Sequence, residues 1–570
     1  MTNSIPKSDG IKNIIESPQD IDDYDQYDVD DSYVDRKDLT NDSQLKPNKE
    51  SPQKKKGGRS KSDSFSQCDT LLRLANDAEL FHTADGRCYA DVIVRDHRET
   101  YALRRKEFAL WLSYKYYQES DSKAPSSESF HSAINSLEAK GRFASKERPV
   151  FTRVGGDEEA AYFDLGNPDW DVVQITKNGW EIITDPPIRF QRSSSMLKVP
   201  RPIREGHINA LKPFVNVGSD NDFVLVVAWI LAALRHTGPY PVMVITGEQG
   251  SAKSTFCKFI KKLIDPHKAA LRSLPKNNQD LFIGANNAHV LVFDNVSIVS
   301  DALSDSFCRL ATGGGFATRE LYSDSDEIIF DSTKPIVLNG ITQFIARPDL
   351  ADRAIFIDLQ SIPEDKRRPE SEVIDAFERA LPEILGGFFN AMVVGINHLP
   401  TTNLENYPRM ADFAKWISAC EKEIWPEGTF MASYSTNRKE ANSSMIEYDF
   451  IASAIQLLIA EVKTWEGTAT ELLNLLNIKS DPNIIKDRGW PKTPSSLSKK
   501  LKRATTILRQ ANIDVHTERV GHERNRIIKI SSNLSPQPKS ADAVSATSSM
   551  SSGSANKSSM EEYLKASRGQ

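Results

Sequence analysis

One segment of the chain, residues 247–255, constrains its fold more than any other. It reads Gly-Glu-Gln-Gly-Ser-Ala-Lys-Ser-Thr, follows the apolar run 242–246 and precedes the amphipathic run 256–264. A buried strand, a glycine-containing loop and a helix in this order form a phosphate-binding loop, in which backbone N–H groups and the helix N-terminus hold phosphates. The pattern therefore predicts an α/β core that binds a nucleoside triphosphate.

The residues of this loop have distinct expected roles. Lys253 reaches the β- and γ-phosphates, and the Ser254 hydroxyl ligates Mg²⁺, so ATP and Mg²⁺ are the expected cofactors. Ala252 stands where glycine is commoner, and Gly250 is expected to supply the flexibility. The alternative is a simple turn between a strand and a helix. The predicted nucleotide contacts are Gly247, Glu248, Gln249, Gly250, Ser251, Ala252, Lys253, Ser254 and Thr255.

Length and composition limit the class of protein. A chain of 570 residues with 26% charged residues is long enough for about three domains. Its net charge of −6 means that any nucleic-acid surface is local. The five cysteines are scattered without metal-ligand spacing. The first residues do not resemble a signal peptide, and the longest apolar run, 223–234, is too short to span a bilayer, so we expect a cytoplasmic protein without a membrane partner.

Shifts in composition predict a multidomain architecture. The predicted parts are a disordered tail (1–65), an α+β N-terminal domain (66–205), an α/β phosphate-loop ATPase domain (206–400), a helical connector (401–467), a C-terminal winged helix (468–531) and a second disordered tail (532–570).

Within residues 66–205, short strand patterns near residues 89–95, 161–165 and 172–175 alternate with helical patterns at 104–117 and 127–140. The aromatic side chains of this region, such as Trp180 and Phe190, allow two readings, a base-stacking surface or a core. The core reading is favoured, because most aromatic residues of globular domains are buried.

A second element of the nucleotide site lies about forty residues after Lys253. The run 289–293 is apolar and ends in Asp294. A carboxylate that closes a buried strand at this distance from a phosphate loop holds the Mg²⁺ shell, so Ser254 and Asp294 are the predicted metal contacts.

The order of the segments that follow resembles a known family. After Asp294 come a glycine-containing segment with a basic residue (313–322), a strand that ends in Asn339 and a following arginine, Arg353. This order resembles the superfamily 3 helicase core of phage and poxvirus-type primase-helicases, which is related to the AAA+ ATPases. It is also similar to the ATP-binding proteins of phages and mobile elements that carry a GEQGSAKST loop. The resemblance covers residues 235–360 closely.

The resemblance implies further roles. Asn339 matches the sensor asparagine that polarises the attacking water, and Arg353 matches the arginine offered to a nucleotide across a subunit interface. Residues 313–322 match a pore hairpin that grips single-stranded DNA, with Arg319 as the candidate contact. Alternatives remain: Asn339 as a cap of the turn before Gly340, Arg347 in place of Arg353, and Arg319 as a solvated hairpin residue.

One position departs from the family pattern. The residue after Asp294 is Asn295, whereas family members have an acidic residue that orients and deprotonates water. An amide orients water but does not accept its proton. Slow hydrolysis is therefore one expectation, and substitution by another carboxylate, Asp301 or Asp305, is the other.

The C-terminal region predicts a DNA-binding surface. Helical patterns at 468–476 and 494–509 followed by two strand patterns read as a winged helix, in which basic residues outnumber acidic ones by about three to one between residues 492 and 529. A protein-binding winged helix is the alternative. The predicted DNA contacts here are Lys499, Lys500, Lys502, Arg503, Arg524 and Arg526.

These expectations favour an ATP-dependent DNA helicase or replication motor of a phage or mobile element. It is expected to form a homo-oligomeric ring, of which a hexamer is one form, to bind single- and double-stranded DNA, and to work with a primase or other replication proteins. The main alternative is a nucleotide-gated DNA-binding regulator with weak or no ATP hydrolysis. A small-molecule kinase is a third class, for which the sequence offers no acceptor pocket. Lys253, Asp294, Asn295, Asn339 and Arg353 are the predicted catalytic residues.

Overall fold

A computed structural model describes residues 66–314, 316–319, 327–330, 333–341, 344–345, 347–487, 489–520 and 525–532. For residues 316–319, 327–330, 520 and 525 it describes the backbone only. The predicted tails 1–65 and 532–570 lie outside the described residues, apart from Ser532.

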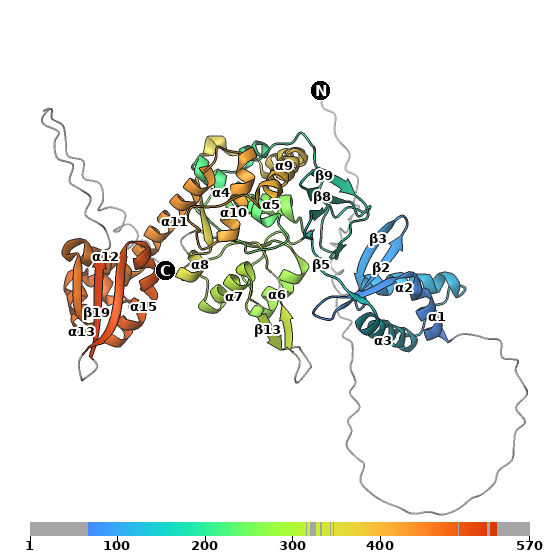
Figure 1. The fold of residues 1–570 in the computed structure, drawn as a ribbon, viewed down its shortest axis with the longest axis horizontal. Coiled ribbons are helices and arrows are strands. Elements are labelled where there is room, and N and C mark those ends of the chain that lie inside the picture. Colours follow the sequence, from blue (N-terminus) through green and yellow to red (C-terminus); the bar gives the residue numbers. More distant parts are fainter. Residues whose placement is uncertain are drawn as a thin grey trace, which may run out of the picture. The chain divides into compact units, whose positions relative to one another are not determined.

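The first part of the described chain is a four-stranded sheet covered by helices (Figure 1). Ser66 and Ser126 cap the first and third helices by accepting hydrogen bonds from the backbone N–H groups of Asp69 and Ser129. The strand order is β3-β2-β1-β4. The elements are α1 (Gln67–Leu74), β1 (Glu79–His82), β2 (Cys88–Val94), β3 (His97–Ala102), α2 (Lys106–Glu119), α3 (Ser127–Ala144) and β4 (Lys146–Glu147). The two helices and the strand predicted here are present, with ends within two residues of those expected, except that α3 continues four residues beyond its predicted end.

A second sheet follows within the region predicted as one α+β domain. It is an antiparallel meander of β6 (Val154–Gly156), β7 (Ala161–Asp164), β8 (Val172–Thr176) and β9 (Gly179–Ile183), beside the short parallel pair β5 (Val150–Phe151) and β10 (Arg189–Phe190). Trp180 and Phe190 are 5% and 3% exposed, and Trp180 packs edge-on against Phe389. These aromatic residues belong to the core, as the favoured reading predicted.

The central part is a parallel sheet of order β12-β15-β11-β16 with helices around it. Ile245 of β11 lies opposite Asn339 of β15 and Ile357 of β16. The apolar run 223–234 forms a buried helix. The elements are α4 (Asp220–Ala233), β11 (Val242–Gly247), α5 (Lys253–Ile264), α6 (Asn278–Asn287), β12 (Leu291–Phe293), α7 (Asp301–Thr312), β15 (Ile336–Asn339), α8 (Pro348–Ala351) and β16 (Ala354–Leu359).

A two-stranded hairpin extends from this part between α7 and β15 (Figure 1). β13 (Phe316–Arg319) pairs with β14 (Glu327–Phe330), and Arg319 lies opposite Glu327 in the last described pair. The backbone hairpin that the family resemblance implies is therefore present, while the side chain of Arg319 lies outside the described residues.

Three helices follow β16: α9 (Glu370–His398), α10 (Ala411–Cys420) and α11 (Thr429–Tyr448). α11 packs against β16, α10 packs on α4, and α9 packs on α5 and on β8 and β9 of the meander. A Cβ at Gly386 of α9 would lie 1.7 Å from the carbonyl oxygen of Ile203, so glycine allows this segment to approach the helix. By length and composition α9 is apolar enough to cross a membrane, but 56% of its apolar window is buried within the described fold. Phe377, Phe388 and Phe389 account for much of this burial.

The C-terminal part has its own hydrophobic core, which begins at Met445. Its three-stranded sheet has the order β17-β19-β18. The helix before β17, which the sequence assigned to the connector, packs into this core, and β17 itself was not predicted. The elements are α12 (Phe450–Val462), β17 (Thr464–Thr468), α13 (Ala469–Lys479), α14 (Pro482–Lys486), α15 (Pro494–Gln510), β18 (Ile513–Val520) and β19 (Asn525–Ser532).

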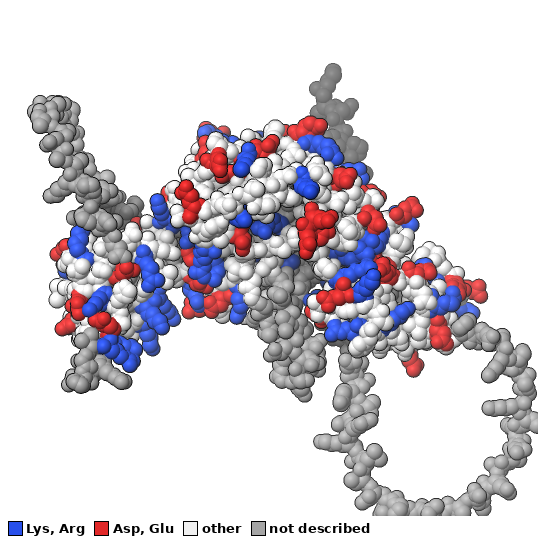
Figure 2. All heavy atoms as spheres, in the orientation of Figure 1, with Lys and Arg blue, Asp and Glu red and all other residues white. Residues whose placement is uncertain are grey.

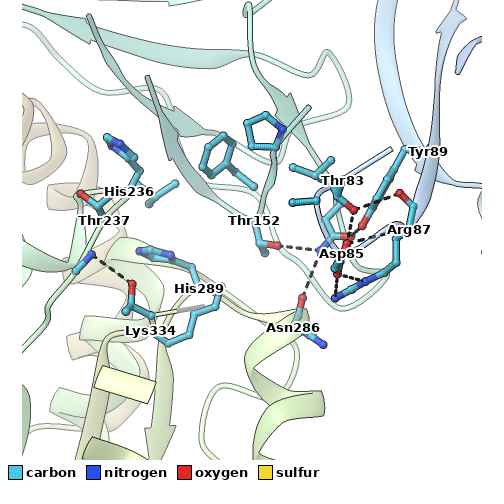
Figure 3. Close-up of a pocket in the computed structure, with 18 of the residues that line it drawn as sticks. Thr83, Asp85, Arg87, Tyr89, Thr152, His236, Thr237, Asn286, His289 and Lys334 are labelled. Atoms are coloured by element: carbon cyan, nitrogen blue, oxygen red, sulfur yellow. Dashed lines mark hydrogen bonds and ion pairs between the residues drawn. The ribbon is translucent and has the colours of Figure 1, made fainter. Parts of the chain in front are cut away.

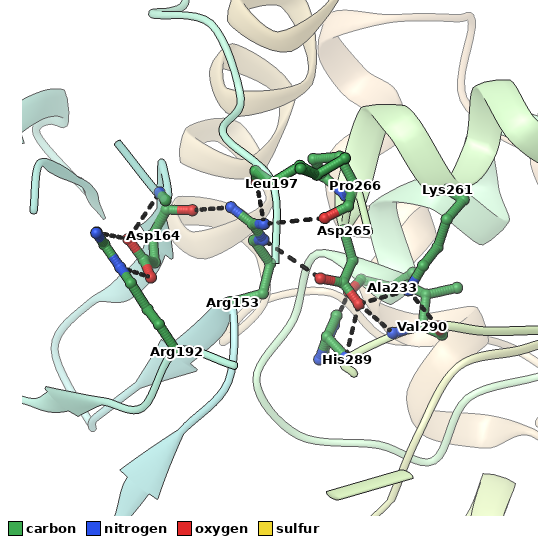
Figure 4. A network of polar contacts seen from close by, with 11 residues as sticks. Arg153, Asp164, Arg192, Leu197, Ala233, Lys261, Asp265, Pro266, His289 and Val290 are labelled. Carbon is green, nitrogen blue, oxygen red and sulfur yellow. Dashed lines mark hydrogen bonds and ion pairs between the residues drawn. The ribbon is translucent and has the colours of Figure 1, made fainter. Parts of the chain in front are cut away.

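A buried ionic network joins the β6–β9 meander to the central part (Figure 4). Asp265 accepts hydrogen bonds from Lys261 Nζ at 2.7 Å and from the backbone N–H of His289 at 2.7 Å, and Arg153 Nε lies 3.4 Å away. Arg153 is fully buried, and Asp265 is 1% exposed. Burial raises the pKa of Asp265, but Lys261 and Arg153 lower it by more, so the carboxyl stays ionised far below its ordinary range.

Replacing Asp265 by asparagine is expected to destabilise the protein by about 3–5 kcal/mol at pH 7, because two cations stay buried without their countercharge. Urea unfolding measures this difference. The matched control is Asp375→Asn on the exposed side of α9, which should change stability by less than about 0.5 kcal/mol.

The difference should also depend on pH. A carboxyl with a depressed pKa contributes stability above its unfolded pKa and loses it as pH falls toward the folded value. The gap between the wild type and Asp265→Asn should therefore shrink as pH falls below about 4. A loss no larger than that of Asp375→Asn would contradict the network's role.

Candidate functional site

The loop between β11 and α5 has a backbone that depends on residues with positive φ. Gly247 has φ of 143°, Gly250 of 88° and Ala252 of 62°. A Cβ at Gly247 would lie 2.5 Å from the carbonyl oxygen of Leu359, so only glycine lets β11 and β16 approach there. Ala252 lies in the left-handed region just before the helix, which explains why glycine is commoner at this position.

Lys253 lies folded over this loop. Its Nζ donates to the carbonyl oxygens of Gly247 at 2.8 Å and Glu248 at 2.7 Å, and lies 3.3 Å from the hydroxyl of Ser251. Burial lowers its pKa, while Asp358 and Asp294 act in the opposite direction. The ammonium is therefore held at the mouth of the loop by neutral oxygen atoms that an anionic ligand can outcompete.

Asp294 joins three segments at the carboxyl edge of the sheet. Its Oδ1 accepts from the Ser254 hydroxyl at 3.1 Å, from the backbone N–H of Asn295 at 3.0 Å and from Nδ2 of Asn339. Ser254 lies in the first turn of α5, Asp294 follows β12, and Asn339 ends β15. The two residues predicted for the metal and the predicted sensor asparagine thus lie together.

Asn339 is 1% exposed, and its Oδ1 has no hydrogen-bond partner among the described residues. Its amide nitrogen points to Asp294 rather than to the turn at Gly340. A buried carbonyl oxygen without a partner beside a carboxylate marks a place for a donor such as water.

The residues present fit Mg²⁺ shared with phosphates. The hydroxyl of Ser254 and the carboxylate of Asp294 are hard oxygen ligands, and Mg²⁺ is commonly bound by one or two such groups together with water and substrate phosphates. Among the described residues no group of three or more His, Cys, Asp or Glu side chains is placed to hold a metal by itself.

Asn295 takes a left-handed conformation, with φ of 56°, and its side chain is exposed. Asparagine and aspartate tolerate this conformation better than most residues. Of the two carboxylates considered as substitutes for the missing acid, Asp305 forms an ion pair of 2.9 Å with Arg347, and Asp301 begins α7. Neither makes a contact with Asp294 among the described residues.

Arg353 lies at the opposite edge of the sheet from Lys253. It immediately precedes β16, which runs parallel to β11 for six residue pairs, or about 20 Å. It pairs with Asp349 and is 18% exposed, whereas Arg347 is 33% exposed. Arg353 therefore lies away from the loop of its own subunit, whereas Arg347 contacts the start of α7 through the carbonyl oxygen of Asp301.

The predicted DNA contacts of the C-terminal part lie mostly on α15. Lys499, Lys502 and Arg503 are exposed, and Lys500 is half-buried. None of the four makes an ion pair with a described residue. Figure 2 shows Lys and Arg side chains gathered over α15. Arg524 lies outside the described residues.

The β18–β19 pair, which forms the predicted wing, also has a feature that favours an anionic partner. Arg526 is exposed and lies directly opposite Arg519 on the neighbouring strand. Like charges in directly opposed positions are destabilising unless an anion lies between them. Arg519 thereby joins Arg526 as a candidate phosphate contact.

Sequence patterns missed two neighbours of the loop. Asp358 accepts from the Thr246 hydroxyl at 2.9 Å, and Asn216 Nδ2 donates to the Ser251 carbonyl oxygen at 3.3 Å. The sequence pattern that could have found Asp358 is a carboxylate near the end of a buried strand. This pattern predicts a residue near the loop only when the strand is known to pair with β11.

Replacing Ala252 by glycine is expected to stabilise the protein by about 1 kcal/mol, because an L-residue with a Cβ is strained at this positive φ. Urea unfolding checks the change. The control, Ala302→Gly in the first turn of α7, is exposed and should lose about 0.5–1 kcal/mol instead. Destabilisation by both substitutions would show that Ala252 is not strained.

Two family models match the chain. Residues 208–425 match a model described as "Actinomycete integrative conjugative element replication protein", and residues 451–548 match the "AICE RepA C-terminal domain". No curated protein matches the chain significantly. The first matched segment contains the whole candidate nucleotide site, and the second contains α15.

Several solved structures are similar at low identity. One is "The A form apo structure of NrS-1 C terminal region-CTR", at 11% identity and a TM-score of 0.36, covering 82% of this chain and 99% of that chain. Another is "SCCmec type IV Cch - active helicase", at 13% identity and a TM-score of 0.41, covering 79% of this chain and 92% of that chain. These TM-scores are too low to support an assignment. The family matches identify the chain as a replication protein of a mobile element, similar over the two matched segments to the replication protein of actinomycete integrative conjugative elements.

Proposed function

We propose that the protein is an ATP-dependent DNA motor that assembles into a homo-oligomeric ring and unwinds or remodels DNA during replication of a mobile element. The observation that carries this proposal is the Asp294 carboxylate, which contacts Ser254 of the phosphate loop and Asn339 of β15. This arrangement supports a cation-binding role for Ser254 and Asp294 and a water-orienting role for the Asn339 amide at one end of the sheet. The same arrangement is expected of an AAA+-related superfamily 3 helicase core, which the sequence resembles.

Each residue has a role in phosphoryl transfer to water. Lys253 leaves the loop carbonyls and holds the phosphates, and Ser254 and Asp294 hold Mg²⁺, which neutralises charge on the phosphates when bound. Asn339 orients the attacking water through its amide. Because phosphoryl transfer depends mainly on position and positive charge, no covalent intermediate is required.

Assembly completes the site. Arg353 lies about 20 Å along the sheet from the loop of its own subunit, so it serves a nucleotide bound by a neighbour. To do so, its guanidinium must either break the ion pair with Asp349 or lie at the subunit interface with that ion pair intact. A head-to-tail interface of this kind closes into a ring, of which a hexamer is one form.

DNA contacts lie on two separate elements. The exposed cations of α15, together with the β18–β19 wing, fit a winged helix that holds duplex DNA. The β13–β14 hairpin is proposed to contact a single strand in the ring pore, with Arg319 as the contact. We further propose that the protein works with a primase or another replication protein and is located in the cytoplasm.

A nucleotide-gated DNA-binding regulator is the second candidate, and Asn295 favours it. The exposed amide after Asp294 does not accept a proton from water. A protein of this class binds ATP through Lys253 and hydrolyses it slowly or not at all.

ATP hydrolysis with and without single-stranded DNA separates the two candidates. The motor predicts DNA-stimulated turnover that falls by at least about a hundredfold in Lys253→Ala, because the phosphates lose their principal cation. The regulator predicts ATP binding that depends on Lys253, with no turnover under any DNA condition.

The Asn295→Asp variant sharpens this assay. Aspartate tolerates the left-handed backbone and accepts a proton, so turnover is expected to rise by about tenfold or more. Asn403→Asp, an exposed substitution in the loop after α9, is the matched control and should leave turnover unchanged. Unchanged turnover in Asn295→Asp would mean that another group already acts as the base.

Duplex binding as a function of salt tests the C-terminal surface. Replacing Lys499, Lys502 and Arg503 by glutamine should reduce the slope of log K against log salt by about 2–3, since each lost phosphate contact removes about 0.9. The exposed Lys486→Gln on α14 is the control. A triple variant with the wild-type slope would place the DNA surface elsewhere.

A further inference from the structure

We infer that a cavity beside the base of the β13–β14 hairpin binds a nucleotide unit, holding its phosphate near Lys334 and its base against Phe151. The cavity has a volume of about 600 Å³ and is separate from the phosphate loop. This binding does not depend on ATP hydrolysis.

The position of the cavity follows from the elements that line it (Figure 3). Thr312 and Thr333, which precede and follow the hairpin, both line it, as do residues 236–239 before β11. These segments lie at the amino edge of the parallel sheet, whereas Lys253 follows its carboxyl edge. The facing wall comes from the loop between β1 and β2 and from β2, β5 and β6.

Lys334 brings an unneutralised charge to this cavity. Among the described residues its ammonium makes no hydrogen bond or ion pair, and the nearby carboxylate of Asp265 is already engaged by Lys261 and Arg153. Burial lowers the pKa of Lys334 to about 8, so it is still mostly protonated at neutral pH. The buried Lys261 and Arg153 and the half-buried Lys334 share the one carboxylate of Asp265, which favours an anion in the adjacent space.

The opposite wall carries much weaker positive charge. Arg87 lies across the cavity, but it pairs with Asp85 at 2.6 Å and is 46% exposed. His236 and His289 both have pKa values lowered by burial, that of His289 to about 3, so both are neutral at pH 7. The anion is therefore expected at the Lys334 end, with a neutral group filling the rest.

The remaining lining suits a nucleobase. Phe151 is half-buried and lines the cavity, with its ring roughly perpendicular to that of His236 and the centroids 6.4 Å apart, so apolar aromatic surface borders the cavity. Beside it lie the polar groups of Thr152 and Gln191, linked by a hydrogen bond of 3.3 Å. An aromatic face with hydroxyl and amide groups at its edge binds bases by stacking and hydrogen bonding.

A nucleotide unit with this chemistry comes either from single-stranded DNA that passes the hairpin or from a free mononucleotide. Two photoreactive probes distinguish these sources in the full-length protein without ATP: a thymidine hexamer that carries one 5-iodouracil, and 5-iodo-deoxyuridine monophosphate. Iodouracil cross-links to adjacent aromatic side chains, and peptide mass spectrometry locates the adduct.

The expected adduct is on Phe151 or on Tyr89, which lines the cavity from β2, and it should be unchanged in Lys253→Ala, which separates this site from the phosphate loop. Lys334→Gln should reduce its yield by about tenfold, through loss of the ammonium–phosphate contact. Thr237→Trp, which fills the cavity from an exposed position, should do the same without altering the buried charges. Lys268→Gln, an exposed lysine outside the cavity, is the control.

Cross-linking by the hexamer alone identifies a DNA site, and cross-linking by both probes identifies a mononucleotide site. The inference is overturned if neither probe labels Phe151 or Tyr89, or if Thr237→Trp, with an unchanged melting temperature, is labelled as efficiently as the wild type.

Discussion

The parallel register of β12, β15, β11 and β16 decides where each charged group of the candidate site lies. Because Ile245 is opposite Asn339 and Phe293 is opposite Leu338, the loop after β11, Asp294 and Asn339 meet at one edge. The same register places Arg353 at the other edge. We propose that a single chain holds the cation-binding half of the site and that Arg353 serves the nucleotide of a neighbouring subunit, so that hydrolysis depends on assembly.

The segment that carries Arg353 is also tied to the later helices. Asp352 lies one residue before Arg353. Its carboxylate accepts a hydrogen bond of 2.8 Å from Arg409, and its backbone carbonyl oxygen accepts one of 2.9 Å from Arg438 of α11. Gln510, at the end of α15, donates to the same carboxylate at 3.1 Å. The proposed interface arginine and the proposed DNA-binding helix thus contact one short segment. A shift of α15 on DNA binding would therefore act on this segment through the hydrogen bond between Gln510 and Asp352.

Local patterns predicted the parts of the site that are contiguous in sequence. The strand, loop and helix predicted within about 25 residues are present, as is the strand that ends before Asp294, while the nucleotide and metal roles of these residues stay predictions. Features set by tertiary contact were not predictable in this way. Burial of Arg153 depends on Asp265, which is 112 residues away, and α12 joins the C-terminal core through an apolar face that equally suits a connector helix. Whether Asn339 senses the nucleotide and Arg319 contacts DNA stays a prediction.

We propose that each ATP site is completed by an arginine from a neighbouring subunit, and a mixture of two inactive variants tests this proposal. Lys253→Ala keeps Arg353 but lacks a working loop, whereas Arg353→Ala keeps the loop but lacks the arginine. In an equimolar mixture that exchanges subunits, about a quarter of the interfaces combine an intact loop with an intact arginine. If the arginine acts across the interface, we expect DNA-stimulated ATP hydrolysis at about a quarter of the wild-type rate. Activity no higher than the mean of the two variants measured separately, with subunit exchange verified, would contradict it.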